Sequence, residues 1–230
     1  MQDFSLEALR LMRALSPTAD AARDPLCLVG DGHQRIYHTK IPLSRAGIDV
    51  RGRSRRLKVN YRTSEQIRQY AQRMLQGLDI DDLAGGTASI AGDHSIFKGP
   101  QPLIIRCRDA HAEAHAVVDW VRDLIERRDL KPHEVCVTPY KPVIVQRLNT
   151  AGIQTHELKD REDPGEKVPG VRLGSMKRIK GLEFRVVAMA CADQHDVHDQ
   201  HPEIGALSRC ERYVAATRAR EYLLVTLPEA

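Results

Sequence analysis

Short apolar runs alternate along this chain with longer segments of helical periodicity, and this alternation most constrains its fold. Apolar runs bounded by turn-forming residues predict strands at 26–29, 57–60, 103–105, 135–137, 186–190 and 222–226. Apolar residues at three- and four-residue spacing predict helices at 4–15, 64–78, 114–125, 143–148 and 207–220, and Thr63 or Ser64 is the expected cap of the second. Strands separated by helices predict an α/β fold, with a mostly parallel sheet and helices on both faces.

The composition is that of a globular protein. The 230 residues are 42% hydrophobic and 29% charged, which suits one large domain or one domain with part of another. The five cysteines form no C-x-x-C pair, which favours buried thiols over a disulfide or zinc framework. The sequence shows no secretory leader and no apolar stretch of membrane-spanning length, so we expect a soluble, cytoplasmic protein with no membrane partner.

Charge is concentrated in one segment although the net charge is only +4. Residues 51–62 carry five arginines and one lysine, and no acidic residue lies among them. Such a run is a candidate footprint for phosphates, but it is equally typical of a solvated basic loop that leads into a strand. Both interpretations stay open from the sequence.

Four segments at the edges of predicted elements carry residues suited to nucleotide or nucleic-acid chemistry. An aromatic beside an arginine can stack on a base and reach a phosphate, and the carboxyl ends of parallel strands commonly bind ligands. In the last segment, small residues let a helix lie close to a neighbour, and we expect Arg218 to be held outward at its exposed face. Alone, each segment has an ordinary interpretation as a turn or a helix start. The segments are VGDGHQRIY at 29–37, LKVNYRT at 57–63, GSMKRIKGLEF at 174–184 and RYVAATRAR at 212–220.

Together and in this order, the four segments resemble motifs of UvrD/Rep-like superfamily 1 DNA helicases. The family patterns are V-G-D-x-x-Q-x-I-Y, N-Y-R-[ST], a motif that ends in K-G-L-E-F, and Y-V-A-x-T-R-A. The resemblance covers nearly the whole chain. It implies that residues 1–56 are the tail of a first RecA-like domain and that residues 57–230 form the second, a P-loop NTPase-like fold that lacks the P-loop.

The resemblance also implies roles for individual residues. ATP lies between the two RecA-like domains in this family, and forked guanidinium groups stabilise the charge that spreads over the transferred phosphoryl group. Single-stranded DNA is gripped partly by stacking on aromatic side chains. The implied γ-phosphate contacts are Gln34, Arg62 and Arg218; the other nucleotide contacts are Tyr61 at the adenine, Glu183 at the ribose, and Gly181; the DNA contacts are Tyr37, Ser175 and Lys177.

The sequence departs from the family pattern in two motifs. Ser175 and Lys177 stand where the family usually has threonine and histidine, so a hydroxyl is kept and an imidazole is lost. The usual Arg-x-Leu-x-Tyr-Val is replaced by Cys210-Glu211-Arg212-Tyr213-Val214, which predicts different packing before Tyr213.

Parts of a complete motor are missing from this sequence. It contains no G-x-x-x-x-G-K-[ST] loop, and the chain begins within the motif that should supply the magnesium-binding Asp-Glu pair. We therefore expect ATP and Mg²⁺ to be cofactors only of the complete enzyme, and hydrolysis by this chain alone to be negligible. The expected partners are single-stranded DNA and a first RecA-like domain in cis or in trans. Residues 64–173 leave no room for the large 2B insertion.

Other interpretations remain. Aspartate, histidine and glutamate crowd residues 193–203, which raises a metal-dependent hydrolase, although their spacing is poor for ligation and we expect no metal site. A non-catalytic DNA-binding or regulatory module derived from a helicase, or a subunit completed in trans, fits equally well. If strand 26–29 has lost its neighbours, residues 1–56 should pack poorly or borrow an edge of the second-domain sheet.

Overall fold

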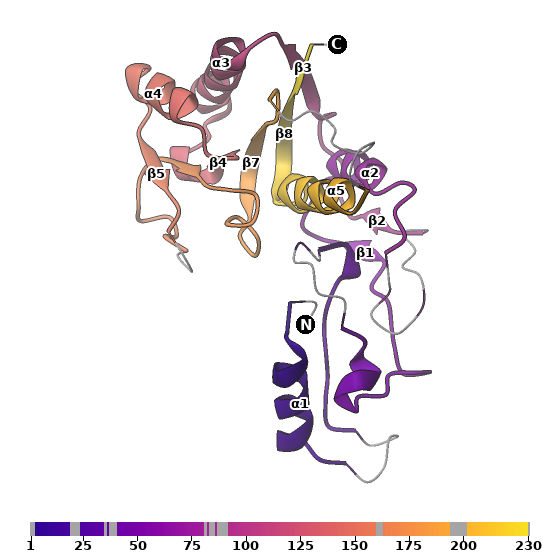
Figure 1. Cartoon of the computed structure of the whole chain (residues 1–230). Coiled ribbons are helices and arrows are strands. Elements are labelled where there is room, and N and C mark those ends of the chain that lie inside the picture. Colours follow the sequence, from indigo (N-terminus) through magenta and orange to yellow (C-terminus); the bar gives the residue numbers. More distant parts are fainter. Residues whose placement is uncertain are drawn as a thin grey trace.

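The computed structural model describes residues 3–18, 24–34, 36, 41–80, 82, 86, 92–159, 163–193 and 202–229. Helices and strands alternate through most of this range (Figure 1). In chain order the elements are α1 (Leu6–Leu15), η2 (Gly32–Gln34), η3 (Leu43–Ala46), β1 (Val59–Asn60), α2 (Glu65–Met74), β2 (His94–Ser95), β3 (Leu103–Cys107), α3 (Ala110–Arg128), η4 (Pro132–Glu134), β4 (Val135–Thr138), α4 (Pro142–Thr150), β5 (Thr155–Glu157), β6 (Val171–Leu173), β7 (Phe184–Ala190), α5 (Pro202–Ala216) and β8 (Ala219–Pro228).

A six-stranded, wholly parallel sheet is the centre of the molecule. Its strand order is β3-β8-β7-β4-β6-β5, so β7 and β8 lie inside the sheet. The register places Val187 beside both Cys136 of β4 and Leu223 of β8. Nearly every residue of β4, β6 and β7 is buried, as expected for apolar runs covered on both faces of a parallel sheet.

Helices cover both faces of the sheet. One core cluster joins α3 and α4 to the sheet, and a second joins α2 and α5 to its other face. The first is built on the stripe Val117, Val121 and Leu124 of α3, which begins where the Asp109 carboxylate accepts a hydrogen bond from the Ala112 amide at 2.7 Å. The predicted α/β class, the parallel sheet and the helices on both faces are therefore confirmed.

The N-terminal region, residues 3–50, lies outside the sheet, below it in the view of Figure 1. Its own small cluster is formed by Leu9, Leu43, Ala46 and Ile48, with Leu26 and Leu28 packed against it. This region contacts the sheet unit through η2, which lies against α5. The expectation that it borrows an edge of the sheet is wrong for the described residues, because every neighbour in the sheet order comes from residues 103–228.

The predicted buried strand at residues 26–29 is not a strand. These residues have no regular structure, Cys27 is exposed and Val29 is 76% exposed. A strand is stabilised by ladder partners and by packing on its faces, and residues 26–29 belong to neither of the described sheets. The alternating leucines bury one side of an extended segment instead.

Other local predictions also need correction. The helix predicted to reach Arg220 ends at Ala216, because β8 begins at Ala219 and pairs there with Phe184. Ser64 occupies the N-cap position of α2 without a side-chain capping bond, while the Thr63 hydroxyl donates to the Thr217 carbonyl at 3.3 Å. Strands β2, β5 and β6 were missed, since each has only two or three residues. No described helix is both long and apolar enough to cross a bilayer.

Candidate functional site

A tight turn after β1 positions the first candidate residues. The Asn60 side-chain oxygen accepts hydrogen bonds from the amides of Arg62 at 2.8 Å and Thr63 at 3.1 Å. The turn leaves the Tyr61 ring 69% exposed and carries the Arg62 side chain toward β7. Tyr61 and Arg62 thus provide an aromatic ring and a guanidinium group at consecutive positions, and the exposed ring is available for stacking.

Arg62 meets Glu183 across the sequence. The Arg62 Nε donates to the Glu183 Oε1 at 2.6 Å, and both side chains are about two-fifths exposed, at 38% and 41%. Gly181, which precedes this contact, has a φ of +91° and so takes a backbone conformation that a side chain would strain. The motif residues therefore form an accessible ion pair whose two charges remain able to exchange partners.

The structure contradicts the predicted outward orientation of Arg218. Its side chain is not held outward but is 1% exposed, with Nε donating to the Val214 carbonyl at 3.0 Å and Nη2 donating to the Thr217 hydroxyl at 3.2 Å. The reason is that α5 has already ended, so the side chain folds back over its last turn. Burial and the neighbouring Arg62 lower the pKa of Arg218 to about 10, so it remains a cation at neutral pH.

The segment around Gln34 packs against the same helix. The Asp31 carboxylate accepts from the His33 amide at 2.9 Å and from the Gln34 Nε2 at 3.0 Å. Burial acts to raise the pKa of Asp31, but the His33 hydrogen bonds outweigh it and the pKa is lowered. The His33 ring lies 6.0 Å from the partly buried Tyr213 ring of α5. Gln34 is thus fixed by its own loop.

Lys180 ties this loop to the turn before β7. Its Nζ donates to the Gln34 carbonyl at 2.9 Å and to both carboxylate oxygens of Asp3, at 2.6 and 2.7 Å. Two of the motif segments, distant in sequence, are therefore joined directly. The link also holds the N-terminal region against the sheet unit.

These contacts gather the candidate nucleotide residues at the amino ends of β7 and β8. Glu183 directly precedes β7, and Arg218 directly precedes β8. The expectation that ligands bind at carboxyl strand ends does not describe this arrangement. Two guanidinium groups, a carboxylate and an exposed aromatic ring suit a ligand with phosphates, hydroxyls and a flat base. We name Tyr61, Arg62, Glu183 and Arg218 the amino-edge cluster.

The predicted DNA contacts lie elsewhere. Ser175 follows the carboxyl end of β6, and its hydroxyl accepts from the Arg178 amide at 3.2 Å. The Lys177 ammonium lies 3.2 Å from the Glu211 carboxylate and is half-exposed. Tyr37 falls outside the described residues. Ser175 and Lys177 are close in the chain and near the surface, but each already has an internal partner.

A buried polar group at the opposite, carboxyl edge of the sheet was missed. The fully buried Glu113 of α3 accepts from the Lys141 ammonium at 2.6 Å, from the Ala192 amide at 2.7 Å and from the Thr226 hydroxyl. Lys141 also donates to Asp193 at 2.6 Å. Burial acts to lower the pKa of Lys141, but these carboxylates raise it overall. A signal was present, because Glu113 interrupts the otherwise apolar stripe of α3.

The described residues contain no group of side chains that could hold a metal ion. Within the described ranges no three histidine, cysteine or carboxylate side chains gather closely enough to hold an ion, and residues 194–201 lie outside those ranges. The cysteines lie outside disulfides, and all are buried except Cys27. Burial raises the pKa of Cys191 to about 12, so that thiol stays protonated.

Similarity to known proteins is found among solved structures. No protein-family model and no curated protein sequence matches the chain. Among solved structures, the C-terminal domain of a possible DNA helicase from Lactobacillus plantarum WCFS1 matches with a TM-score of 0.50 and 18% identity, over 74% of this chain and 88% of that chain. The Hef helicase domain of Pyrococcus furiosus matches with a TM-score of 0.34 and 18% identity, over 52% of this chain and 26% of that chain. The first likeness shows a shared fold.

Proposed function

We propose that this chain is the C-terminal, RecA-like motor domain of an ATP-dependent DNA helicase of the UvrD/Rep type. The observation that carries the proposal is the amino-edge cluster, in which three separate motif segments bring Arg62, Glu183 and Arg218 together. The fold shared with a helicase C-terminal domain supports it. By family resemblance, the complete motor moves in the 3′ to 5′ direction on single-stranded DNA.

In this proposal the chain supplies half of a nucleotide site. Tyr61 stacks on the adenine, Glu183 accepts a hydrogen bond from the ribose, and Arg62 and Arg218 approach the γ-phosphate. The residues fit these roles chemically, because the exposed ring, the exchangeable ion pair and the second guanidinium lie at one edge. Magnesium bound to ATP neutralises phosphate charge, and its protein ligands belong to a first RecA-like domain, as does the lysine that cradles the phosphates.

Nuclear magnetic resonance of the chain titrated with Mg-ATP tests the nucleotide site. The expected result is a set of shifts confined to Tyr61, Arg62, Glu183 and the start of β8. Arg62→Gln should weaken these shifts several-fold, whereas Arg122→Gln on the exposed face of α3 should leave them unchanged. Shifts centred instead on Lys141, at the carboxyl edge, would overturn the assignment.

Hydrolysis provides the second test. We expect the isolated chain to show no ATPase activity that single-stranded DNA stimulates. Clear stimulated activity that Arg62→Gln abolishes would contradict the half-motor proposal, because it would require a complete phosphate site within this chain.

One observation favours a second candidate, a DNA-binding or regulatory module without catalysis. Arg218 is buried and hydrogen-bonded to its own helix end, and Arg62 is paired with Glu183. Both arginines are therefore engaged without a nucleotide. DNA affinity that does not respond to Mg-ATP, with no shifts at Tyr61, would favour this module over a motor domain.

A further inference from the structure

We propose that the segment between the N-terminal region and the sheet unit grips the phosphodiester backbone of nucleic acid, at a site separate from Ser175 and Lys177. The basic strip is defined as Arg51, Arg53, Arg55, Arg56 and Lys58. The proposal goes beyond the helicase assignment and does not rest on the amino-edge cluster.

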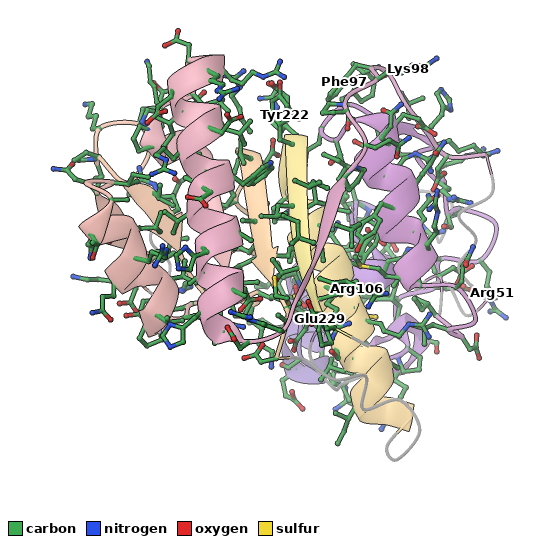
Figure 2. The ribbon with its side chains drawn as sticks, turned by 90° about the horizontal axis from the view of Figure 1, so that it is seen from above. Arg51, Phe97, Lys98, Arg106, Tyr222 and Glu229 are labelled. Atoms are coloured by element: carbon green, nitrogen blue, oxygen red, sulfur yellow. The ribbon has the colours of Figure 1, made fainter. Side chains whose placement is uncertain are left out.

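The strip is an exposed, irregular segment. Every residue from 51 to 58 is exposed, and the chain passes from a turn at 51–53 into residues without helix or strand before β1 begins. Figure 2 shows Arg51 at the outer rim of the molecule, on the side away from α3. Seven residue steps of extended chain reach at most roughly 25 Å, long enough to follow several phosphates of a strand at about 3.4 Å each.

Three of the arginines, Arg51, Arg53 and Arg56, are paired with carboxylates and remain exposed. Arg51 donates to both oxygens of Asp49, at 3.0 and 2.9 Å, while its side chain stays 85% exposed. Arg56 lies 2.5 Å from the carboxylate of Asp93. The Arg51–Asp49 pair is exposed on both sides, and such pairs are weak and exchange readily for a phosphate. The carboxylates orient these side chains without removing them from the surface.

The remaining two cations have no such neighbour. Within the part of the chain that the structure describes, neither Arg55 nor Lys58 forms an ion pair with a carboxylate. No acidic residue occurs between positions 51 and 58. These two cations, flanked by arginines whose side chains stay exposed, produce a surface of one sign, which attracts a polyanion.

The chemistry of the strip favours nucleic acid over a lipid surface. Four of its five cations are arginines, whose planar forks match phosphate oxygens in pairs. Helices that lie on membranes need an amphipathic face with bulky apolar anchors, whereas this segment is not helical and carries only Leu57 between its cations. A repeated anionic backbone is the partner that an extended row of guanidinium groups fits.

Salt-dependent binding of the 230-residue chain to labelled oligonucleotides tests the proposal. Fluorescence anisotropy between about 50 and 200 mM salt gives the slope of log K against log salt, which falls by about 0.7 for each lost phosphate contact on single strands and about 0.9 on duplex. For Arg55→Gln/Lys58→Gln we expect a decrease in that slope of about 1.4 on single strands or about 1.8 on duplex. The arm with the larger affinity loss identifies which form is bound.

Arg122→Gln/Arg127→Gln is the matched control, because it removes the same charge from exposed positions of α3. We expect its slope and affinity to stay close to those of the unmodified chain. Equal losses in both double variants, or binding to phosphatidylserine vesicles without binding to either oligonucleotide, would overturn the proposal. The Mg-ATP shifts at Tyr61 should persist in Arg55→Gln/Lys58→Gln, which separates failure of this site from failure of the nucleotide site.

Discussion

Residues 26–29 and 186–190 are both apolar runs that predict buried strands, yet they have opposite environments. The second run lies in β7, between β4 and β8, and all five of its residues are fully buried. The first run has no strand neighbour, and Val29 is 76% exposed. The comparison teaches that an apolar run indicates burial potential, while ladder partners decide whether it becomes a strand.

The two regions also differ in how they are stabilised. The sheet unit has a core cluster on each face of the sheet, whereas the N-terminal region has a cluster of four buried side chains of its own. It is linked to the sheet unit by Ile36, which packs with Val214 of α5, and by Lys180 before β7. Small clusters bury little apolar surface and open at a lower free energy than large cores. We therefore expect the N-terminal region to unfold before the sheet unit.

The largest effect is expected at the buried ion pair of the sheet unit. Lys141→Met leaves the Glu113 carboxylate buried without its cation, so the free energy of unfolding should fall by about 3–5 kcal/mol. Urea unfolding monitored by the single tryptophan, Trp120, whose ring packs against the core under α3, reports this loss.

Lys177→Met is its control, because the partner Glu211 lies near the surface and the loss should stay below about 1 kcal/mol. A loss of similar size in both variants would show that the Glu113 network does not stabilise the sheet unit.

Paired leucine substitutions test the difference between the two cores. Leu224→Ala removes a fully buried side chain from β8 and should lower the free energy of unfolding of the sheet unit by about 2–5 kcal/mol. Leu9→Ala should instead remove helical circular dichroism from α1 while the Trp120 transition keeps its urea midpoint. If Leu9→Ala shifted the Trp120 transition as far as Leu224→Ala does, the two regions would form one cooperative unit.

Acid should weaken the two regions over different pH ranges. Hydrogen bonds from Arg68 lower the pKa of Glu65 from 4.5 to about 2, and a hydrogen bond from Arg13 lowers that of Asp24 from 3.8 to about 2. A lowered carboxyl pKa stabilises the fold above its ordinary value, and that contribution is lost as pH falls toward the folded value. The α2 contribution should thus begin to weaken near pH 4.5 and the N-terminal contribution near pH 3.8.

Amide exchange of α1 and α2 during acid titration measures the two contributions separately. Asp24→Asn should abolish the acid dependence of α1 alone, and Glu65→Gln that of α2 alone. Loss of both dependences in either variant would show that the two regions titrate together.

The smallest effect is expected at the surface. Asp49→Asn breaks the pair with Arg51, but both side chains are more than half exposed and water replaces the lost contact. The urea midpoints of both regions should therefore stay unchanged within measurement error. A clear shift of either midpoint would mean that the segment joining the regions contributes to their stability.

The sequence alone predicted the architecture well because long periodic segments are determined locally. The helix at 110–128 and the strand at 184–190 carry continuous patterns, and their alternation leaves few topologies. Strands β5 and β6 were missed because a run of three residues cannot be distinguished from loop by its pattern. Their positions are decided by the pairing of β6 with β4 and of β5 with β6, which local sequence does not encode.

The candidate site was predictable as a set of residues but not as an arrangement. Motif spacing identified Arg62 and Glu183, yet nothing local indicates that they lie 2.6 Å apart across 121 positions. The outward orientation expected for Arg218 was wrong, because it depended on where α5 ends. That end is determined by the pairing of β8 with β7, a contact between distant segments.

The Arg62–Glu183 ion pair has a consequence for discrimination among anions. A simple anion that takes the Arg62 guanidinium leaves the Glu183 carboxylate without its cation, so the exchange gains little. A ligand that offers an anion to Arg62 and a hydroxyl to Glu183 leaves neither group unpaired. The pair thus weakens the binding of small competitors such as inorganic phosphate or sulfate. It favours the binding of molecules that carry both chemical groups at the right separation.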